Sequence, residues 1–370
     1  MTAHSYKWIG KRSIRPDGLE KVTGKARFGA DYHLPGMLVG AVLRSAHAHA
    51  TIRSMDTSAA RAMPGVKAVI TCEDIPEISS EEAMTGESII DFRDLSHNIL
   101  ARGKVLYAGH PVAAVAATSR RVAEAAAAAI EVDYETHPHV LTVDEAMAEG
   151  APILHDDLVT AGDDDSDGSP TNVAKRHVFE RGDIAEGFAA ADVVIEREFT
   201  TRQVHQGYIE PHAVVADTGE DGRSIVWCSS QGHFLVREQT AKVLGWEPSQ
   251  LKVIPAEIGG GFGGKTTIYL EPLAVVLSAR AGRPVKMVMD RDEVFFASGP
   301  GPGSRLRVKL GARKDGKLVA AEVWMAFEAG AFKGSPVGAA CQTVLAPYEI
   351  HNVSIVGLDV VVNTPKVAAY

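Results

Sequence analysis

Short apolar runs of strand length alternate with helix-like stretches in the first part of the chain. The predicted strands lie at residues 38–44, 66–71, 111–117 and 130–135. A short helix is predicted after Asp56, ended by Pro64-Gly65, and a longer alanine-rich helix at residues 120–130. Glycines between β-branched residues at positions 9–26 predict turns that join short strands. This order predicts a small α/β domain over residues 1–150.

An acidic stretch interrupts this pattern. Residues 162–170 read Gly-Asp-Asp-Asp-Ser-Asp-Gly-Ser-Pro and lack large apolar side chains, so they predict a solvated linker within residues 151–175. Carboxylates at short spacing could instead chelate calcium. The spacing is not that of an EF-hand, however, and no Glu closes the loop. We therefore predict a linker between two domains.

Strand-like and helix-like runs resume after the linker. The predicted strands lie at residues 193–199, 213–217, 224–228, 251–256, 285–289, 306–310, 318–326 and 355–362. Two helices are predicted, at residues 234–244 and 269–281, because Gly245 and Gly282 follow them as stop signals. Together these elements predict a mixed α/β domain over residues 176–370, and the α+β class for the whole chain.

Composition and charge narrow the range of partners. The chain has 370 residues, too many for one compact core, and a formal net charge of −9 without a run of Lys or Arg. Nucleic acids and anionic membranes are therefore poor candidates. Cys72, Cys228 and Cys341 stand far apart, so they predict neither a disulfide framework nor a metal cluster. Because no apolar run reaches about 18 residues, we predict a cytoplasmic protein without a membrane span.

The strongest local signal is the glycine cluster Ile-Gly-Gly-Gly-Phe-Gly-Gly-Lys at residues 258–265, between a predicted strand and a predicted helix. Bare N–H groups in such a segment can face oxygen atoms or a phosphate. A dinucleotide fingerprint fits Gly259, Gly261 and Gly264, although the acidic residue expected about 20 positions later is not well placed. Lys265-Thr266 formally completes a Walker A loop. A plain strand-to-helix turn is the third interpretation.

The phrase Gly-Gly-Gly-Phe-Gly-Gly-Lys resembles the molybdopterin-binding loop of the xanthine dehydrogenase, aldehyde oxidase and carbon monoxide dehydrogenase family. Ser229-Ser230-Gln231 stands one helix and one strand earlier, where that family has a Ser/Thr-rich phrase ending in Gln. Further matching phrases lie at residues 22–32, 44–50, 108–113, 205–212 and 282–286. The resemblance covers nearly the whole chain apart from the acidic stretch. It implies the N-terminal half of a large subunit, with a hammerhead domain over residues 1–150.

The resemblance also implies a cofactor and its site. The cofactor would be molybdenum–molybdopterin, with the cytosine dinucleotide form as one option, held by Gln231, Gly260, Gly261, Phe262 and Gly263. The side-chain amide of Gln231 would donate a hydrogen bond to an oxo ligand of the metal; its plainer interpretation is an amide that binds backbone at a strand end. The family holds molybdenum through pterin sulfurs, so no side chain is expected to ligate the metal directly.

Histidines and carboxylates near these phrases give only weak support for a metal site formed by side chains or for a catalytic base. The pairs His47 with His49 and His205 with His212 invite a metal-site interpretation, but neither has a third ligand at a suitable spacing. Glu210 is expected to hold backbone or its neighbour His212 rather than to act as a base.

The family hydroxylates small molecules with water-derived oxygen and passes electrons to iron–sulfur and FAD centres. The resemblance therefore implies an iron–sulfur subunit, a FAD subunit and a chain that supplies the C-terminal half of the molybdenum domain. The family's catalytic glutamate lies near the end of a longer chain, so no catalytic residue is expected in this one.

The resemblance also bears on the substrate. Thr266 stands where purine-oxidising members have a glutamate, so a substrate pocket there favours an aldehyde, an N-heterocycle or a similar small molecule over xanthine. The alternatives are a nucleotide binder of the P-loop kind and a non-catalytic truncated or assembly subunit.

Overall fold

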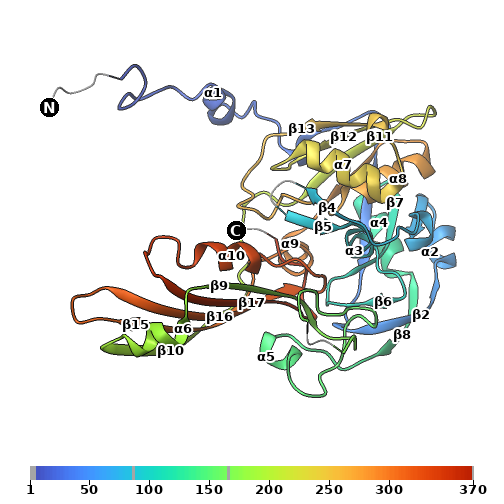
Figure 1. The fold of residues 1–370 in the computed structure, drawn as a ribbon. Helices are drawn as coiled ribbons and strands as arrows, with labels where there is room; N and C mark the ends of the chain where they lie inside the picture. The colour runs from blue at the N-terminus through green and yellow to red at the C-terminus, as the bar shows by residue number, and fades with distance from the viewer. Residues whose placement is uncertain (1–5, 86–87, 165–166, 369–370) are drawn as a thin grey trace.

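The computed structural model describes residues 6–85, 88–164 and 167–368 (Figure 1). Its strands form sheets of seven, five, three and two strands. In Figure 1 the elements gather in two groups, one around the seven-stranded sheet with helices α7 and α8 and the other around the five-stranded sheet. This mixture of helices with mixed sheets is the α+β class that the sequence predicted.

The seven-stranded sheet joins both halves of the chain. In sheet order its strands are β13 (Leu251–Pro255), β12 (Ser224–Cys228), β11 (Ala213–Thr218), β14 (Val285–Val288), β1 (Leu38–Arg44), β7 (Pro111–Ala117) and β3 (Val66–Thr71). β1 and β14 run parallel, with Leu38 opposite Val285. The two predicted domains therefore share one sheet, because β1 and β14 satisfy each other's backbone hydrogen bonds across the predicted boundary.

The other sheets are formed by strands of one half each. The five-stranded sheet has the order β10 (Val193–Thr201), β15 (Ser304–Ala312), β16 (Leu318–Gly330), β17 (Asn352–Val361) and β9 (Val173–Arg181). The three-stranded sheet has the order β6 (Lys104–Val105), β2 (Ala50–Asp56) and β8 (Glu131–Thr136). β4 (Glu82–Thr85) and β5 (Ser88–Asp91) form a hairpin.

Helices lie on and around these sheets, except for α1, which belongs to the exposed N-terminal segment. They are α1 (Gly18–Val22), α2 (Ser58–Ala62), α3 (Phe92–Ile99), α4 (Arg120–Ala128), α5 (Val143–Ala146), α6 (Ile184–Ala189), α7 (His233–Leu244), α8 (Glu271–Ala281), α9 (Arg291–Ala297) and α10 (Val337–Thr343). Helix α8 is buried from Glu271 to Ser278 and packs against β11, β3 and β7. A helix that is apolar on all sides belongs in a core rather than at a surface. It therefore fixes the position of the segment that precedes it, which is the glycine cluster.

Most predicted elements are present, and their ends follow the predicted signals. Helices α7 and α8 both stop at a glycine in the left-handed conformation, Gly245 with φ +67° and Gly282 with φ +61°. One prediction was wrong: residues 9–26 contain α1 and no strand in their described structure. The apolar side chains of this segment are exposed and have no sheet to join.

The predicted linker is only partly solvated. Asp164 and Asp167 at its acidic centre are exposed, but Leu154 and Asn172 near its ends are almost completely buried. Asn172 explains the difference, because its side chain accepts from Leu154 N (3.1 Å) and donates to Pro152 O (3.0 Å). The linker is therefore fastened to the body at its ends, with an exposed acidic loop between them.

His110 is a buried neutral side chain that fastens helix α3 to the start of β7. Its Nδ1 accepts from Leu106 N (3.1 Å), and its Nε2 lies 2.8 Å from His97 O, so Nε2 carries the proton. Burial lowers the pKa of His110 to about 3. A second proton would place N–H against N–H at Nδ1, which this packing does not accommodate.

We expect this histidine to weaken the fold in acid. Between its ordinary pKa of about 6.5 and about 3, the unfolded chain binds a proton at His110 and the folded chain does not. The free energy of unfolding should therefore fall as the pH falls through this window, by about 1.4 kcal/mol per pH unit from this site. Denaturant unfolding at pH 7 and pH 5 of the wild type, H110Q and the exposed-site control H139Q checks this. An equal pH effect in H110Q and H139Q would contradict it.

Candidate functional site

The glycine cluster forms a loop between β13 and α8 whose backbone is largely bare. Within the described part of the chain, the N–H groups of Gly260, Gly261 and Phe262 have no hydrogen-bond partner. Phe262 has φ +48° and is the only described residue other than glycine with a positive φ. Its ring is exposed. Three successive N–H donors on a strained turn are a suitable arrangement for binding the oxygen or nitrogen acceptors of a ligand.

The loop leaves no room for side chains at its glycines. A Cβ built on Gly261 would lie 2.5 Å from Gln231 Oε1, and one on Gly264 would lie 2.6 Å from the ring of Tyr208. Gly260 has φ +98°. These positions require glycine for close approach and for backbone shape, so the cluster is more specific than an ordinary turn.

Gln231 supports the loop from the end of β12. Its Oε1 accepts from Gly263 N (2.9 Å) and from Lys265 N (3.2 Å). Since both partners are donors, the atom facing them must be the oxygen, and the NH₂ group of the amide is turned away from these two contacts. Its backbone N–H also donates to Lys265 O (2.9 Å). The plainer sequence interpretation, an amide that binds backbone, is therefore correct for the oxygen, and the Gly263 N–H is committed to Gln231.

Glu210 and Lys265 form a buried ion pair under the loop. Lys265 Nζ lies 2.8 Å from Glu210 Oε2, with the lysine side chain fully buried and the glutamate side chain 10% exposed. The same Oε2 accepts from Gly259 N (2.7 Å), and Oε1 accepts from Gly29 N (3.2 Å). Burial lowers the pKa of Lys265, and the Glu210 carboxylate opposes that shift. One carboxylate thus ties together the N-terminal segment, the start of the loop and its end.

A network of rings and hydroxyls underlies this pair. Tyr208 OH lies 2.7 Å from His212 Nε2 and 2.9 Å from Ser298 Oγ. His205 Nε2 also lies 2.9 Å from Ser298 Oγ. Burial holds the pKa of His212 well below its usual value, so this histidine is neutral. Glu210 therefore binds backbone, as predicted, but its side-chain partner is Lys265, while His212 bonds to Tyr208.

The geometry argues against a nucleotide loop of the P-loop kind. In such a loop the lysine reaches the phosphates and the helix begins directly after the glycines. Here Lys265 is turned inward against Glu210, and α8 begins only at Glu271. The Walker A match was therefore a coincidence of spacing, which the many neighbouring glycines made easy. A dinucleotide fingerprint fails for the same reason, because the glycines do not open a helix.

Thr266 closes the loop from the other side. Its Oγ1 donates to Gly263 O at 2.9 Å, and its side chain is half-buried. The place of Thr266 in a substrate pocket stays a prediction.

Other candidate groups have local partners. His49 Nδ1 lies 2.8 Å from Pro138 O, and His47 stacks edge-on against Tyr134. In the parts of the chain that the structure describes, no three His, Cys, Asp or Glu residues are placed to hold a metal ion. The same parts contain no helix that is long and apolar enough to cross a bilayer.

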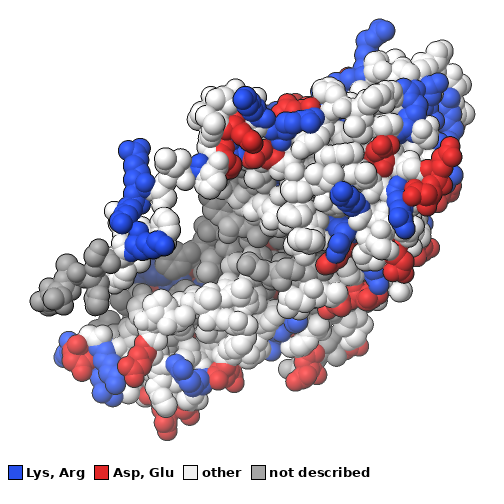
Figure 2. Space-filling model, turned by 90° about the horizontal axis from the view of Figure 1, so that it is seen from above, with Lys and Arg blue, Asp and Glu red and all other residues white. Residues whose placement is uncertain are grey.

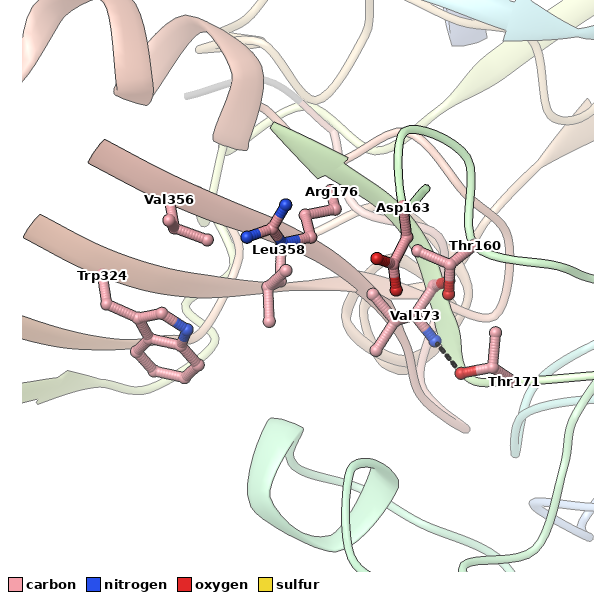
Figure 3. A pocket seen from close by; sticks show the side chains of 8 residues that line it. All are labelled: Thr160, Asp163, Thr171, Val173, Arg176, Trp324, Val356 and Leu358. Carbon is pink, nitrogen blue, oxygen red and sulfur yellow. Dashed lines mark hydrogen bonds between the residues drawn. The ribbon is translucent and has the colours of Figure 1, made fainter. Parts of the chain in front are cut away.

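A hollow lies on the five-stranded sheet, and none of its lining residues belongs to the glycine loop (Figure 3). It has a volume of about 410 Å³, an apolar floor of Trp324, Val356 and Leu358, and the opposite charges of Arg176 and Asp163 at its side. It contains no hydroxyl or thiol paired with a base, so its residues do not form a recognisable catalytic group.

Comparison with known proteins finds a matching family model for each half of the chain. A family model described as "Molybdopterin cofactor-binding domain" matches residues 166–370. A second, described as "Aldehyde oxidase and xanthine dehydrogenase, a/b hammerhead domain", matches residues 23–138. The hammerhead match ends before the acidic segment at residues 162–170, and the cofactor-domain match begins within it. They agree with the order of the two predicted domains, whose exact bounds stay a prediction.

Individual relatives agree with the family models. The chain is 32% identical to the nicotinate dehydrogenase large molybdopterin subunit of Eubacterium barkeri, over 99% of this chain and 81% of that subunit. It is 34% identical to the carbon monoxide dehydrogenase large chain of Afipia carboxidovorans, over 89% of this chain and 40% of that one. The crystal structure of quinoline 2-oxidoreductase from Pseudomonas putida 86 superposes with a TM-score of 0.85 at 30% identity, covering 98% of this chain and 45% of that one. The chain thus spans less than half of the last two proteins.

The buried pair makes a direct prediction for stability. In E210Q the Lys265 ammonium is left buried without its counter-charge, and we expect the free energy of unfolding to fall by about 3–5 kcal/mol. The double variant E210Q/K265M removes both charges and should recover most of this loss. Denaturant unfolding measures both, with E220Q at an exposed site as the control. Equal stabilities of E210Q and E220Q would contradict the role given to the pair.

Proposed function

We propose that this chain, which belongs to the xanthine dehydrogenase and aldehyde oxidase family of molybdopterin-binding subunits, forms half of the cofactor cradle of a molybdenum hydroxylase. The observation that carries the proposal is the loop at Gly260, Gly261 and Phe262, whose three N–H groups have no partner in the described chain. A molybdenum–molybdopterin group supplies the redox chemistry when it is bound. The chain's own part is to hold and orient that group.

Some residues of the cradle would contact the cofactor, and others hold the contacting residues in place. Gly260, Gly261 and Phe262 offer backbone donors to the cofactor, and the two glycines let the backbone pass close to Tyr208 and Gln231, which support the loop. Gln231 has two tasks. Its oxygen holds Gly263 and Lys265 in place, and its amide NH₂ would be a hydrogen-bond donor to the bound cofactor. Gly263 acts through this support, because its N–H is already bonded to Gln231.

The reaction that we propose is hydroxylation of a small molecule with oxygen derived from water. Nicotinate and quinoline, which the names of two relatives contain, are N-heterocycles, so an N-heterocycle is the first substrate class to test, followed by aldehydes. Thr266 in place of an acidic residue makes a purine a weaker candidate. The family's catalytic glutamate is expected outside this chain.

The remaining parts of the proposal concern partners. The chain covers less than half of the carbon monoxide and quinoline enzymes, which supports a further chain or segment that completes the molybdenum domain. We also propose that the chain assembles with an iron–sulfur subunit and a FAD subunit. The cofactor would be the cytosine dinucleotide form, and the complex would be cytoplasmic. The unpaired Cys72, Cys228 and Cys341 are consistent with a reducing compartment.

Metal analysis of the complex formed by co-expression with genes neighbouring this one tests the function. We expect molybdenum and pterin in a stoichiometric amount with this chain. A complex that contains neither, under conditions in which other molybdenum enzymes of the host are loaded, would disprove the proposal.

Two variants at Gln231 separate its tasks. Q231E keeps an oxygen for Gly263 N and Lys265 N but lacks the amide donor, so the molybdenum content should stay while turnover falls, by roughly tenfold to a hundredfold. Q231A removes both, so the molybdenum content should fall as well. Q342A, at an exposed position on α10, is the control. Unchanged turnover in Q231E would contradict the donor role.

A further inference from the structure

Residues 6–27 form a segment, here called the N-terminal arm, that projects from the body (Figure 1). Five of its large apolar side chains are exposed to an unusual degree, from 68% for Trp8 to 94% for Ile14, and Tyr6 is 55% exposed. Ile9, Leu19 and Val22 are similarly exposed, and no residue of α1 within the arm is buried. Single exposed apolar residues are common on protein surfaces, but five in one short segment indicate a surface that another molecule covers.

The arm also differs from the rest of the chain in charge. It contains seven Lys or Arg and two Asp or Glu, a net charge of +5, whereas the whole chain has −9, which leaves −14 for the remainder. Figure 2 shows Lys and Arg side chains on the projecting end at the left of the molecule. Lys11 and Arg12 in the outer part of the arm are exposed. The arm therefore combines apolar anchors with a positive charge.

The root of the arm is fastened to the strand that leads into the glycine loop. Glu257 N donates to Arg27 O (2.9 Å), Phe28 forms a parallel bridge with Glu257, and the Lys21 ammonium pairs with the Glu257 carboxylate. Glu257 lies two residues before Gly259, and Gly29 N is held by Glu210. The root of the arm therefore lies beside the cofactor cradle, so a molecule bound along the arm reaches the cradle at this root.

We infer that the N-terminal arm is a docking segment for an acidic protein subunit that carries the electron-accepting centre. This inference rests on the proposed function, because only a cradle that releases electrons requires such a centre near it. The positive charge of the arm selects an acidic surface and speeds encounter, while Trp8 and Ile14 supply the apolar contacts that retain the partner.

Binding of the co-expressed iron–sulfur subunit to the loaded chain tests the inference. The charge-reversal variant K11E/R12E should weaken binding at least tenfold at low ionic strength and less at high ionic strength. The apolar variant W8S/I14S should weaken it at both. R313E/K314E, which reverses two exposed charges in the turn between β15 and β16, is the matched control and should bind as the wild type does.

Several outcomes would overturn the inference. The first is wild-type affinity for the iron–sulfur subunit in both arm variants. The second is a loss of molybdenum from the variants without a loss of the partner. The third is that the arm variants bind the iron–sulfur subunit normally but no longer bind phosphatidylserine vesicles or a second copy of this chain. Molybdenum content is measured in the same samples. A complex without molybdenum whose assembly still depends on the arm would count against the proposed function and in favour of the docking role.

Discussion

The buried carboxylate of Glu210 is the interaction on which the candidate site depends. It accepts from Gly29 N in the first half of the chain and from Gly259 N at the start of the loop, and it pairs with Lys265 at the end of the loop. A lone carboxylate in this place would be costly to bury, and so would a lone ammonium. Because each satisfies the other, the loop can keep its next three N–H groups free for a ligand.

The same constraint links the fold to the function. The seven-stranded sheet is continuous from β13 to β3, so the N-terminal half and the loop belong to one rigid layer. Helix α8 is buried beneath it and fixes the end of the loop, while Gln231 at the end of β12 supports the middle. The N-terminal arm leaves this layer at Phe28, which forms a bridge with Glu257 just before the loop. The cofactor cradle and the root of the docking segment are therefore neighbours, because Glu257, in the short segment between β13 and the loop, binds that root.

The sequence predicted the elements whose signals are local and missed the contacts that join distant segments. Gly245 and Gly282 ended helices where expected, because a left-handed glycine acts within one turn. The pairing of β1 with β14 and the pair of Glu210 with Lys265 join residues far apart in the chain, and no local pattern contains them. Helix α3 was missed although Asp91 caps it. The prediction that the glycines bind a cofactor came from the family resemblance. The residues alone, with Lys265 after the glycines, fitted a nucleotide-binding loop just as well.

Amide hydrogen exchange at Gly259 and Gly29 tests the central claim most directly. If the Glu210 carboxylate holds both amides, E210Q should lose protection at both by about tenfold to a hundredfold, since a charged hydrogen bond contributes about 1.5–3 kcal/mol. Amides in the core of β11 should change only as far as global stability changes, so their change is subtracted from the changes at Gly259 and Gly29, and E220Q should change neither. Unchanged protection at Gly259 and Gly29 in E210Q would contradict the account.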